Sequence, residues 1–142
     1  MAYDITKVEV WAGDMVNRPG TLARVLEAMA GGGADLEFVI ARRVNDNTSR
    51  GFFAPIKGKK QQEAAKDVGL QKAAGLRALR IEGPNKPGLG AMMTRAIAGA
   101  GVNLRGLSAA AIGKRSVCYI AFDSEEDAKQ AGRVLKKLLG GK

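Results

Sequence analysis

The sequence predicts an α+β fold made of two similar units, each with strands and helices in the order β-α-β-β-α. The first observation behind this prediction is an internal repeat, because an Asn-x-Pro-Gly tetrapeptide begins at Asn17 and again at Asn85, 68 residues later. The second is that the same interval separates Leu36 from Leu104, which end the matching glycine-rich segments. The third is an amphipathic stretch between the two signals in both copies. A fixed interval shared by all of these features indicates a duplicated structural unit.

Two small units packed together also suit the length and composition of the chain. We expect one unit over residues 1–74 and the other over residues 75–142. Either half alone would be marginal, since short chains bury a smaller fraction of their surface than long ones. The hydrophobic share of 46% is that of an ordinary folded domain, so we expect a globular protein.

Hydrophobic spacing predicts the elements of the first unit in chain order. Alternation around Val8 and Val10 predicts a strand over residues 5–12. Pro19 presets the backbone for a helix start, and apolar residues at i, i+3, i+4 and i+7 from Leu22 to Met29 form one helical face. The elements expected after this helix are a strand over 36–41, a strand from 51, a helix over 60–68 and a short strand over 70–72.

The second unit repeats this order, with two differences. Its expected elements are a strand at 79–81, a helix over 89–97, strands over 104–112 and 116–122, and a last helix that Ser124 caps. The alternation around Val8 is out of phase with that around Leu79 and Ile81, so we expect a longer entry loop in the first unit. The second unit also ends at its helix, which leaves no residues for a closing strand.

These elements define a recognised arrangement of layers. A right-handed β-α-β crossover and a β-hairpin in each unit give an antiparallel-rich sheet with its helices on one face. This is the ferredoxin-like plan, present here as two βαββα units with at most one extra strand. The glycines at 31–33 follow a helical stretch, so we interpret them as a helix end and not as a phosphate-binding loop.

The residue types that the chain lacks exclude several kinds of chemistry. Without histidine, histidine-based acid–base catalysis, Ser–His or Cys–His nucleophiles and imidazole zinc sites are impossible. Cys118 is the single cysteine and lies in an apolar segment, so we expect a small core residue and no disulfide. We therefore expect no metal and no cofactor.

The ends and the charge of the chain predict a cytoplasmic protein. The N-terminal residues lack the basic and apolar regions of a secretion signal, and no apolar run approaches the length needed to cross a bilayer, so we expect no membrane partner. The net charge of +9 is spread over short pairs such as Arg42-Arg43, which is typical of a solvated surface. The charge alone does not indicate a nucleic-acid partner.

The segment from Asn17 to Leu22, followed by a helix, glycines and Ala34-Asp35-Leu36, resembles the ACT domain family. The second copy, from Asn85 to Leu89 with Gly101-Val102-Asn103-Leu104, resembles it in the same way. The resemblance covers nearly the whole chain. It implies a regulatory module that binds a small ligand, usually an amino acid, and that pairs side by side to form continuous sheets.

The resemblance also implies where a ligand lies. In the family it sits where the first strand-to-helix loop of one unit meets the start of the second strand of a neighbour. The loop residues that match this pattern are Asn17, Gly20, Thr21 and Leu22 in one site, and Asn85, Gly88 and Leu89 in the other. The matching opposing residues are Asp35 and Leu36, and Asn103 and Leu104. Gly90 stands where the family pattern has leucine, which puts ligand binding at the second loop in doubt.

The chemistry of these residues suits a zwitterion. A helix N-terminus offers free N–H groups and partial positive charge to an α-carboxylate, and a glycine lets the backbone approach closely. Asn17 and Asn85 both donate and accept hydrogen bonds. Asp35 could pair with an ammonium group, whereas Asn103 could only hydrogen-bond it. The alternative is structural, since Asn-x-Pro-Gly is also a good turn, and Asp35 and Asn103 are also good turn caps.

The sequence is compatible with three candidate functions. The first is a non-catalytic amino-acid sensor that acts through a partner, such as a biosynthetic enzyme, or through a homodimer or higher homo-oligomer. The second is an RNA- or single-stranded nucleic-acid-binding protein, because Arg50-Gly51-Phe52 partly matches an RNA-recognition signature, although Pro55 interrupts that strand. The third is a small enzyme that uses Lys59 or Glu63, which no constellation of residues supports. We favour the sensor.

Overall fold

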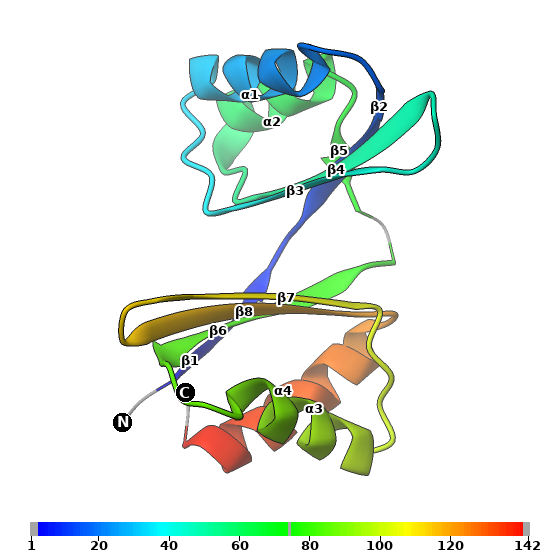
Figure 1. Cartoon of the computed structure of the whole chain (residues 1–142). Helices are drawn as coiled ribbons and strands as arrows, with labels where there is room; N and C mark the ends of the chain where they lie inside the picture. The colour runs from blue at the N-terminus through cyan, green and yellow to red at the C-terminus, as the bar shows by residue number, and fades with distance from the viewer. Residues whose placement is uncertain (1–2, 74, 141–142) are drawn as a thin grey trace. The chain divides into compact units, whose positions relative to one another are not determined.

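The computed structural model describes residues 3–73 and 75–140, and the chain divides into two compact units (Figure 1). The first is formed by Glu9–Ala74, and we call it the inserted unit. The second is formed by Met1–Val8 together with Gly75–Lys142, and we call it the flanking unit. Each unit has one four-stranded sheet in which all paired strands are antiparallel.

The inserted unit places two helices on one face of its sheet (Figure 1). Its strands are paired in the order β3-β4-β2-β5. Their bounds are β2 Trp11–Val16, β3 Phe38–Arg43, β4 Thr48–Ala54 and β5 Gln71–Lys72. The helices are α1 Thr21–Gly31 and α2 Gly58–Asp67.

The core of the inserted unit follows from strand alternation and helix periodicity. Trp11 and Met15 alternate along β2, and Phe53 lies beside Trp11 on β4, so the three side chains share the face toward the helices. Val25 and Met29 lie one turn apart on α1 and are buried against them. Position 51 has no room for a side chain, because a Cβ there would overlap the ring of Phe53 and the Met15 side chain, and glycine avoids this overlap.

The flanking unit has the same plan with a different closing strand. Its strands are paired in the order β1-β6-β8-β7. Their bounds are β1 Asp4–Val8, β6 Arg77–Pro84, β7 Gly106–Ile112 and β8 Arg115–Phe122. The helices are α3 Leu89–Gly99 and α4 Glu125–Leu139. The two ferredoxin-like units expected from the sequence are therefore confirmed.

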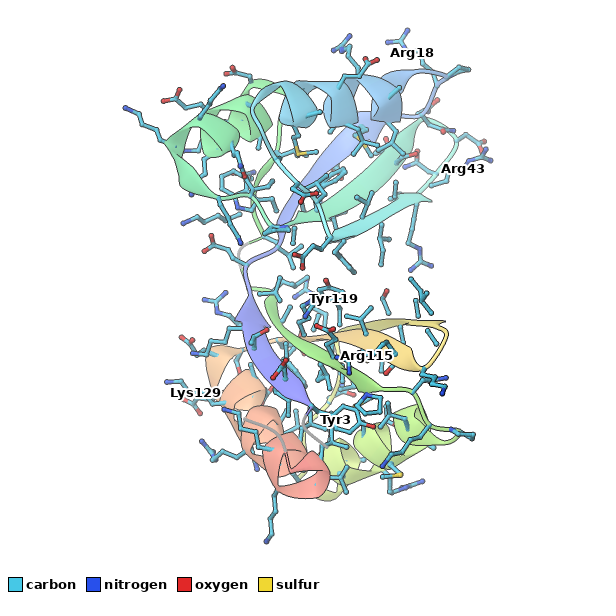
Figure 2. The ribbon with its side chains drawn as sticks, turned by 90° about the vertical axis from the view of Figure 1, so that its left-hand side faces the viewer. Tyr3, Arg18, Arg43, Arg115, Tyr119 and Lys129 are labelled. Atoms are coloured by element: carbon cyan, nitrogen blue, oxygen red, sulfur yellow. The ribbon has the colours of Figure 1, made fainter. Side chains whose placement is uncertain are left out.

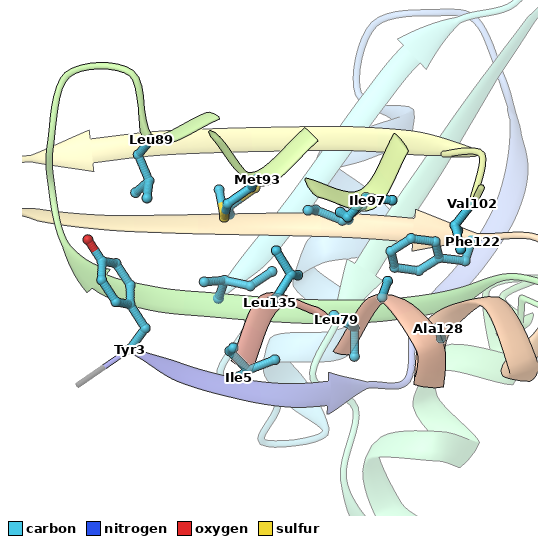
Figure 3. Close-up of a cluster of buried hydrophobic side chains, with 14 residues drawn as sticks. Tyr3, Ile5, Leu79, Leu89, Met93, Ile97, Val102, Phe122, Ala128 and Leu135 are labelled. Carbon is cyan, nitrogen blue, oxygen red and sulfur yellow. The ribbon is translucent and has the colours of Figure 1, made fainter. Parts of the chain in front are cut away.

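Figure 3 shows the core of the flanking unit, where side chains of β1, β6, β8 and both helices meet. Met93 and Ile97 on α3 and Leu135 on α4 are buried against Phe122 of the sheet. The expected cap of the last helix is confirmed, because the Ser124 side chain accepts a hydrogen bond from the backbone N–H of Asp127 at 3.1 Å. Three acidic residues in the first turn of α4 also suit the helix N-terminus.

The N-terminal strand differs from the expected unit boundaries. Strand β1 pairs with β6 from Asp4, opposite Glu82, to Val8, opposite Ala78, so it belongs to the flanking unit and not to a unit spanning residues 1–74. It supplies the closing strand that the sequence of the second unit lacks. Ile5 lies on the helix face of this strand and is buried, which gives the pairing its hydrophobic anchor.

The strand expected over residues 5–12 was wrong in its extent. The chain leaves the flanking sheet after Val8 and starts β2 at Trp11 in the other sheet. Strand β2 ends directly before Asn17, as β6 ends directly before Asn85, so the longer entry loop expected in the first unit is absent. The alternation of Val8 and Val10 predicted one continuous strand. Both residues are shielded from solvent, but the chain passes from one sheet to the other between Val8 and Trp11.

Candidate functional site

The two Asn-x-Pro-Gly loops have the same backbone conformation. Gly20 precedes α1 and Gly88 precedes α3, with φ angles of 89° and 82°, in the left-handed region that glycine adopts without strain. No side chain caps either helix, and neither first turn contains an acidic residue. The partial positive charge of each helix N-terminus is therefore not neutralised from within its own first turn.

Asn17 ties the first loop to the turn between β3 and β4. Its amide nitrogen donates to the carbonyl oxygen of Asp46 at 3.0 Å, and its amide oxygen accepts from the Ser49 hydroxyl at 3.5 Å. Its backbone N–H also donates to the carbonyl oxygen of Asn47 at 2.9 Å. The Asn17 side chain therefore has a structural role in positioning the loop. At the second loop, the backbone N–H of Asn85 donates to the carbonyl oxygen of Lys114 at 2.8 Å.

Two hollows adjoin the first loop, both within the inserted unit. The smaller has a volume of about 270 Å³ and lies between the start of α1 and the end of β3, where Thr21, Arg43 and Ser49 contribute polar groups. The larger has a volume of about 450 Å³ and lies along the first turn of α1, beside Gly20 and Arg24. Both are lined by Val16, Arg18 and Thr21. A small molecule beside the loop could therefore contact both hollows at once.

Arginines surround these hollows. Arg18 lines both, Arg24 lines the larger, and Arg42 and Arg43 line the smaller. Figure 2 shows Arg18 and Arg43 at the same end of the inserted unit. Within residues 3–73 and 75–140, none of the four has an acidic partner within ion-pair distance. The charge of the helix N-terminus and of these arginines adds up, so the hollows favour an anion.

The opposing residues expected from the sequence lie away from the loops of their own units. Asp35 and Leu36 follow the C-terminal end of α1, and a helix of 11 residues places them about 16 Å from its start. Asp35 is exposed, whereas Leu36 packs against the core of the inserted unit. Asn103 is likewise exposed, and Leu104 packs against the flanking core. Neither pair joins its own loop, and their contribution to a neighbouring site stays a prediction.

The second loop differs from the first in its side chains. Leu89 stands where the first loop has Thr21, and it is buried in the flanking core. Figure 3 shows Tyr3 at the same end of this core, with its hydroxyl directed toward the chain that joins β6 to α3. The Tyr3 ring lies against Gly83, which stands where the inserted unit has Met15. Aromatic and aliphatic groups thus replace a hydroxyl beside the second loop.

Sequence reasoning found the loop and missed five polar residues that line the hollows. Arg18, Arg24, Arg42, Arg43 and Ser49 were not among the predicted site residues. Strand pairing brings in the residues of β3 and β4, because Arg43 lies opposite Ser49 on β4, and Ser49 lies opposite Met15 on β2. The available signal was the turn at residues 45–47, since a hairpin folded there places residue 43 beside residue 49.

Two ionisable groups lie elsewhere in the flanking sheet. Glu82 accepts hydrogen bonds from Arg115 at 3.1 Å and from Arg80 at 2.9 Å, and these two contacts lower the pKa of its carboxyl group. Burial raises the pKa of the Cys118 thiol to about 11, so the thiol stays protonated at neutral pH. Both groups belong to the flanking unit, whereas the first loop belongs to the inserted unit.

Two general features of the described residues bear on function. Across residues 3–73 and 75–140, no cluster of acidic residues and cysteine is arranged to hold a metal ion. None of the described helices combines the length and the apolar character that crossing a membrane would require.

Comparisons with known proteins place the chain by its fold. No protein-family model matches the sequence, and no curated protein matches it. Among solved structures, protein BT0572 from Bacteroides thetaiotaomicron is 19% identical with a TM-score of 0.78, and the match covers 96% of this chain and 90% of that one. The ligand-free regulatory subunit of aspartate kinase from Thermus thermophilus is 19% identical with a TM-score of 0.68, and 96% of each chain is covered.

A third structure agrees with these two. The regulatory subunit of aspartate kinase from Thermus flavus is 20% identical with a TM-score of 0.62, and the match covers 96% of this chain and 94% of that one. TM-scores of 0.62 to 0.78 over 96% of this chain show a shared fold. The chain therefore has the two-unit fold of aspartate kinase regulatory subunits, and its resemblance to ACT domains is confirmed at the level of the fold.

Proposed function

We propose that this protein is a non-catalytic regulatory module that binds a small ligand, an amino acid or a close relative, beside loop 17–20 of the inserted unit. The observation that carries the proposal is the hollow of about 270 Å³ between this loop and the end of β3. Sites for drug-sized molecules occupy about 300–1,000 Å³, so this volume suits a smaller compound.

The lining of the hollow supports a carboxylate-bearing ligand. The uncapped start of α1 offers backbone N–H groups, and Gly20, which lines the adjacent hollow of about 450 Å³, leaves room for close approach there. The Thr21 and Ser49 hydroxyls donate or accept hydrogen bonds, and the Arg43 guanidinium binds a carboxylate with two parallel bonds. The likeness to structures described as regulatory subunits of aspartate kinase supports a regulatory role.

A module of this kind acts by changing its own association or that of a partner. We propose that the protein works in the cytoplasm as a homodimer or higher homo-oligomer, or bound to a biosynthetic enzyme. Residues at 35–36 or 103–104 of a neighbouring unit would then complete the ligand site, as the family resemblance implies. Ligand binding would shift the balance between association states by its difference in affinity for them.

The nucleic-acid alternative has weaker support. Its strongest signal was the Arg50-Gly51-Phe52 segment on β4. The Arg50 guanidinium lies 5.4 Å from the Phe52 ring centroid and pairs with the Asp14 carboxylate at 2.9 Å. A base stacking on Phe52 would have to displace this cation, and single-strand binding usually needs several aromatic platforms.

The test is a thermal-shift panel of the 20 amino acids, carried out on the full chain at millimolar concentration. A ligand at about 100 times its Kd stabilises the folded state by roughly 2.7 kcal/mol, which such an assay detects easily. Arg43→Gln should abolish the shift, whereas Arg105→Gln, an exposed arginine of the flanking unit paired with Asp123, should retain it. Absence of a shift with every one of these amino acids and with O-phospho-L-serine would contradict the proposal.

A further inference from the structure

The two repeats differ sharply in charge around otherwise equivalent loops. Positions 68 residues apart correspond, as the two loops and the helices that follow them show. The four arginines at the first loop are Arg18, Arg24, Arg42 and Arg43, and their counterparts are Lys86, Met92, Ala110 and Ala111. At these four matched positions the second repeat therefore has one cation where the first has four.

This concentration of charge is not offset by neighbouring acids. Asp46, whose carbonyl oxygen holds the Asn17 amide, is the acidic residue tied most directly to the first loop. Among the described residues its carboxylate forms no ion pair with any of the four arginines. Strand alternation turns the Arg42 side chain to the other face of the sheet, beside Arg50. The like charges of Arg18, Arg24 and Arg43 remain around the two hollows, and an anionic ligand would relieve their repulsion.

The arginines are also divided between the hollows. Arg24 lines only the larger one, Arg43 lines only the smaller one, and Arg18 lies on the boundary and lines both. A molecule with a single carboxylate would use only one of these positions. A molecule with two acidic groups would place one in each hollow and share Arg18 between them.

We infer that the ligand carries two acidic groups, and that each chain binds one molecule of it, at the inserted unit. The inference rests on the proposed function and specifies its ligand class: an amino acid whose side chain ends in a second acidic group, either a carboxylate or a phosphate. Each acidic group accepts charge-assisted hydrogen bonds from an arginine, and the uncapped N-terminus of α1 adds further donors.

The flanking unit does not offer the same site. Leu89 and Ala111 replace the hydroxyl of Thr21 and the guanidinium of Arg43, and Leu89 is buried. Lys86 and Lys114, whose carbonyl oxygen accepts from the Asn85 N–H, are lysines, so this loop lacks both the hydroxyl and the guanidinium that the first site offers a second acidic group. A binding stoichiometry of one per chain follows, although the sequence contains the loop twice.

The test is isothermal titration calorimetry of the full chain, in which the two members of matched pairs of amino acids are compared. The pairs are L-glutamate with L-glutamine and O-phospho-L-serine with L-serine, so that each pair differs mainly in the second acidic group. We expect the acidic member of at least one pair to bind at least about tenfold more tightly, with one molecule per chain. The pair that shows the preference identifies the acidic group as carboxylate or phosphate.

Matched variants locate the binding. Arg24→Gln and Arg43→Gln should each weaken binding of the acidic member by about ten- to a hundredfold, because each removes a charged hydrogen bond. Lys86→Gln, in the second loop, should leave the affinity unchanged. All three positions are exposed, so the variants should fold, and their melting temperatures without ligand provide the check.

The outcomes separate the two proposals. Equal binding of both members of each pair, two molecules per chain, or a loss of affinity in Lys86→Gln alone would overturn the inference and leave the amino-acid sensor in place. Binding by a neutral amino acid alone would do the same. Failure of every amino acid in the panel to bind would overturn the proposed function and this inference together.

Discussion

The Tyr3 hydroxyl donates a hydrogen bond to the carbonyl oxygen of Pro84 at 2.8 Å, although 81 residues separate the two in sequence. The Tyr3 side chain is 2% exposed, and its ring packs on Gly83, where no Cβ would fit. Both residues lie in the flanking unit, and Pro84 directly precedes the second Asn-x-Pro-Gly loop. The N-terminal strand therefore completes the sheet and also supports the connection from β6 to α3.

This contact predicts a graded response to substitution at Tyr3. Tyr3→Phe keeps the ring and removes one hydrogen bond, so we expect the free energy of unfolding to fall by about 1 kcal/mol. Tyr3→Ala also removes the buried ring and should cost about 3–5 kcal/mol. Urea denaturation of both variants measures the difference. Equal stability of the wild type and Tyr3→Ala would show that the N-terminal strand does not dock as described.

Much of this fold could be predicted from the sequence, and the missing part has a clear physical origin. The repeat and helix periodicity located both loops and all four helices, because these are local patterns. The partner of strand β1 could not be predicted, since alternation around Ile5 and Val8 shows that a strand exists but not which sheet it joins. That choice depends on pairing with β6, whose residues lie 70 to 78 positions further along the chain.

The candidate site could be predicted only where its residues are close to one another in sequence. Gly20 and Thr21 were found because a turn followed by a helix is a local signal. Arg43 was missed because it reaches the loop only through the register of β3 with β4 and of β4 with β2. Sequence spacing places Arg42-Arg43 among dispersed basic pairs, because it does not show that Arg43 lines the same hollow as Arg18.

The left-handed glycines provide a second prediction. Gly20→Ala and Gly88→Ala would force a Cβ into positive φ, which costs about 1–2 kcal/mol. Gly90, two residues after Gly88 and inside α3, has open space around its Cα and no positive φ, so Gly90→Ala should stabilise the helix by up to about 1 kcal/mol. Thermal or urea unfolding measures all three. Destabilisation by Gly90→Ala would contradict the backbone description of this loop.

The Glu82 carboxylate predicts a pH-dependent contribution to stability. Hydrogen bonds from Arg115 and then Arg80 lower its pKa in the folded state. A lowered pKa means that the stabilisation is present above the unfolded-state pKa, and that it is lost as the pH falls through the folded-state value. Glu82→Gln should therefore be less stable than the wild type at pH 7.

The difference between these two proteins should shrink as the pH falls below about 4, because the wild-type carboxylate then becomes protonated. Urea denaturation at pH 7, 5 and 3 measures this difference. Glu27→Gln is the control, since Glu27 is exposed on α1 and has no ion pair among residues 3–73 and 75–140. A Glu82→Gln deficit that is constant from pH 7 to pH 3 would argue against the network with the two arginines.

The Cys118 thiol predicts low reactivity in the folded state. Because burial raises its pKa to about 11, only about one molecule in a thousand carries a thiolate at pH 8, and the side chain is 4% exposed. Ellman's reagent should therefore react slowly with the native protein and fully in guanidinium chloride. The raised pKa also means that burial of the neutral Cys118 thiol contributes its full stability below the unfolded-state pKa, and that this contribution falls as the pH rises toward 11. Rapid reaction of the native protein at pH 8 would show that β8 opens readily, and that the flanking core is less tightly closed than Ile120 and Phe122 indicate.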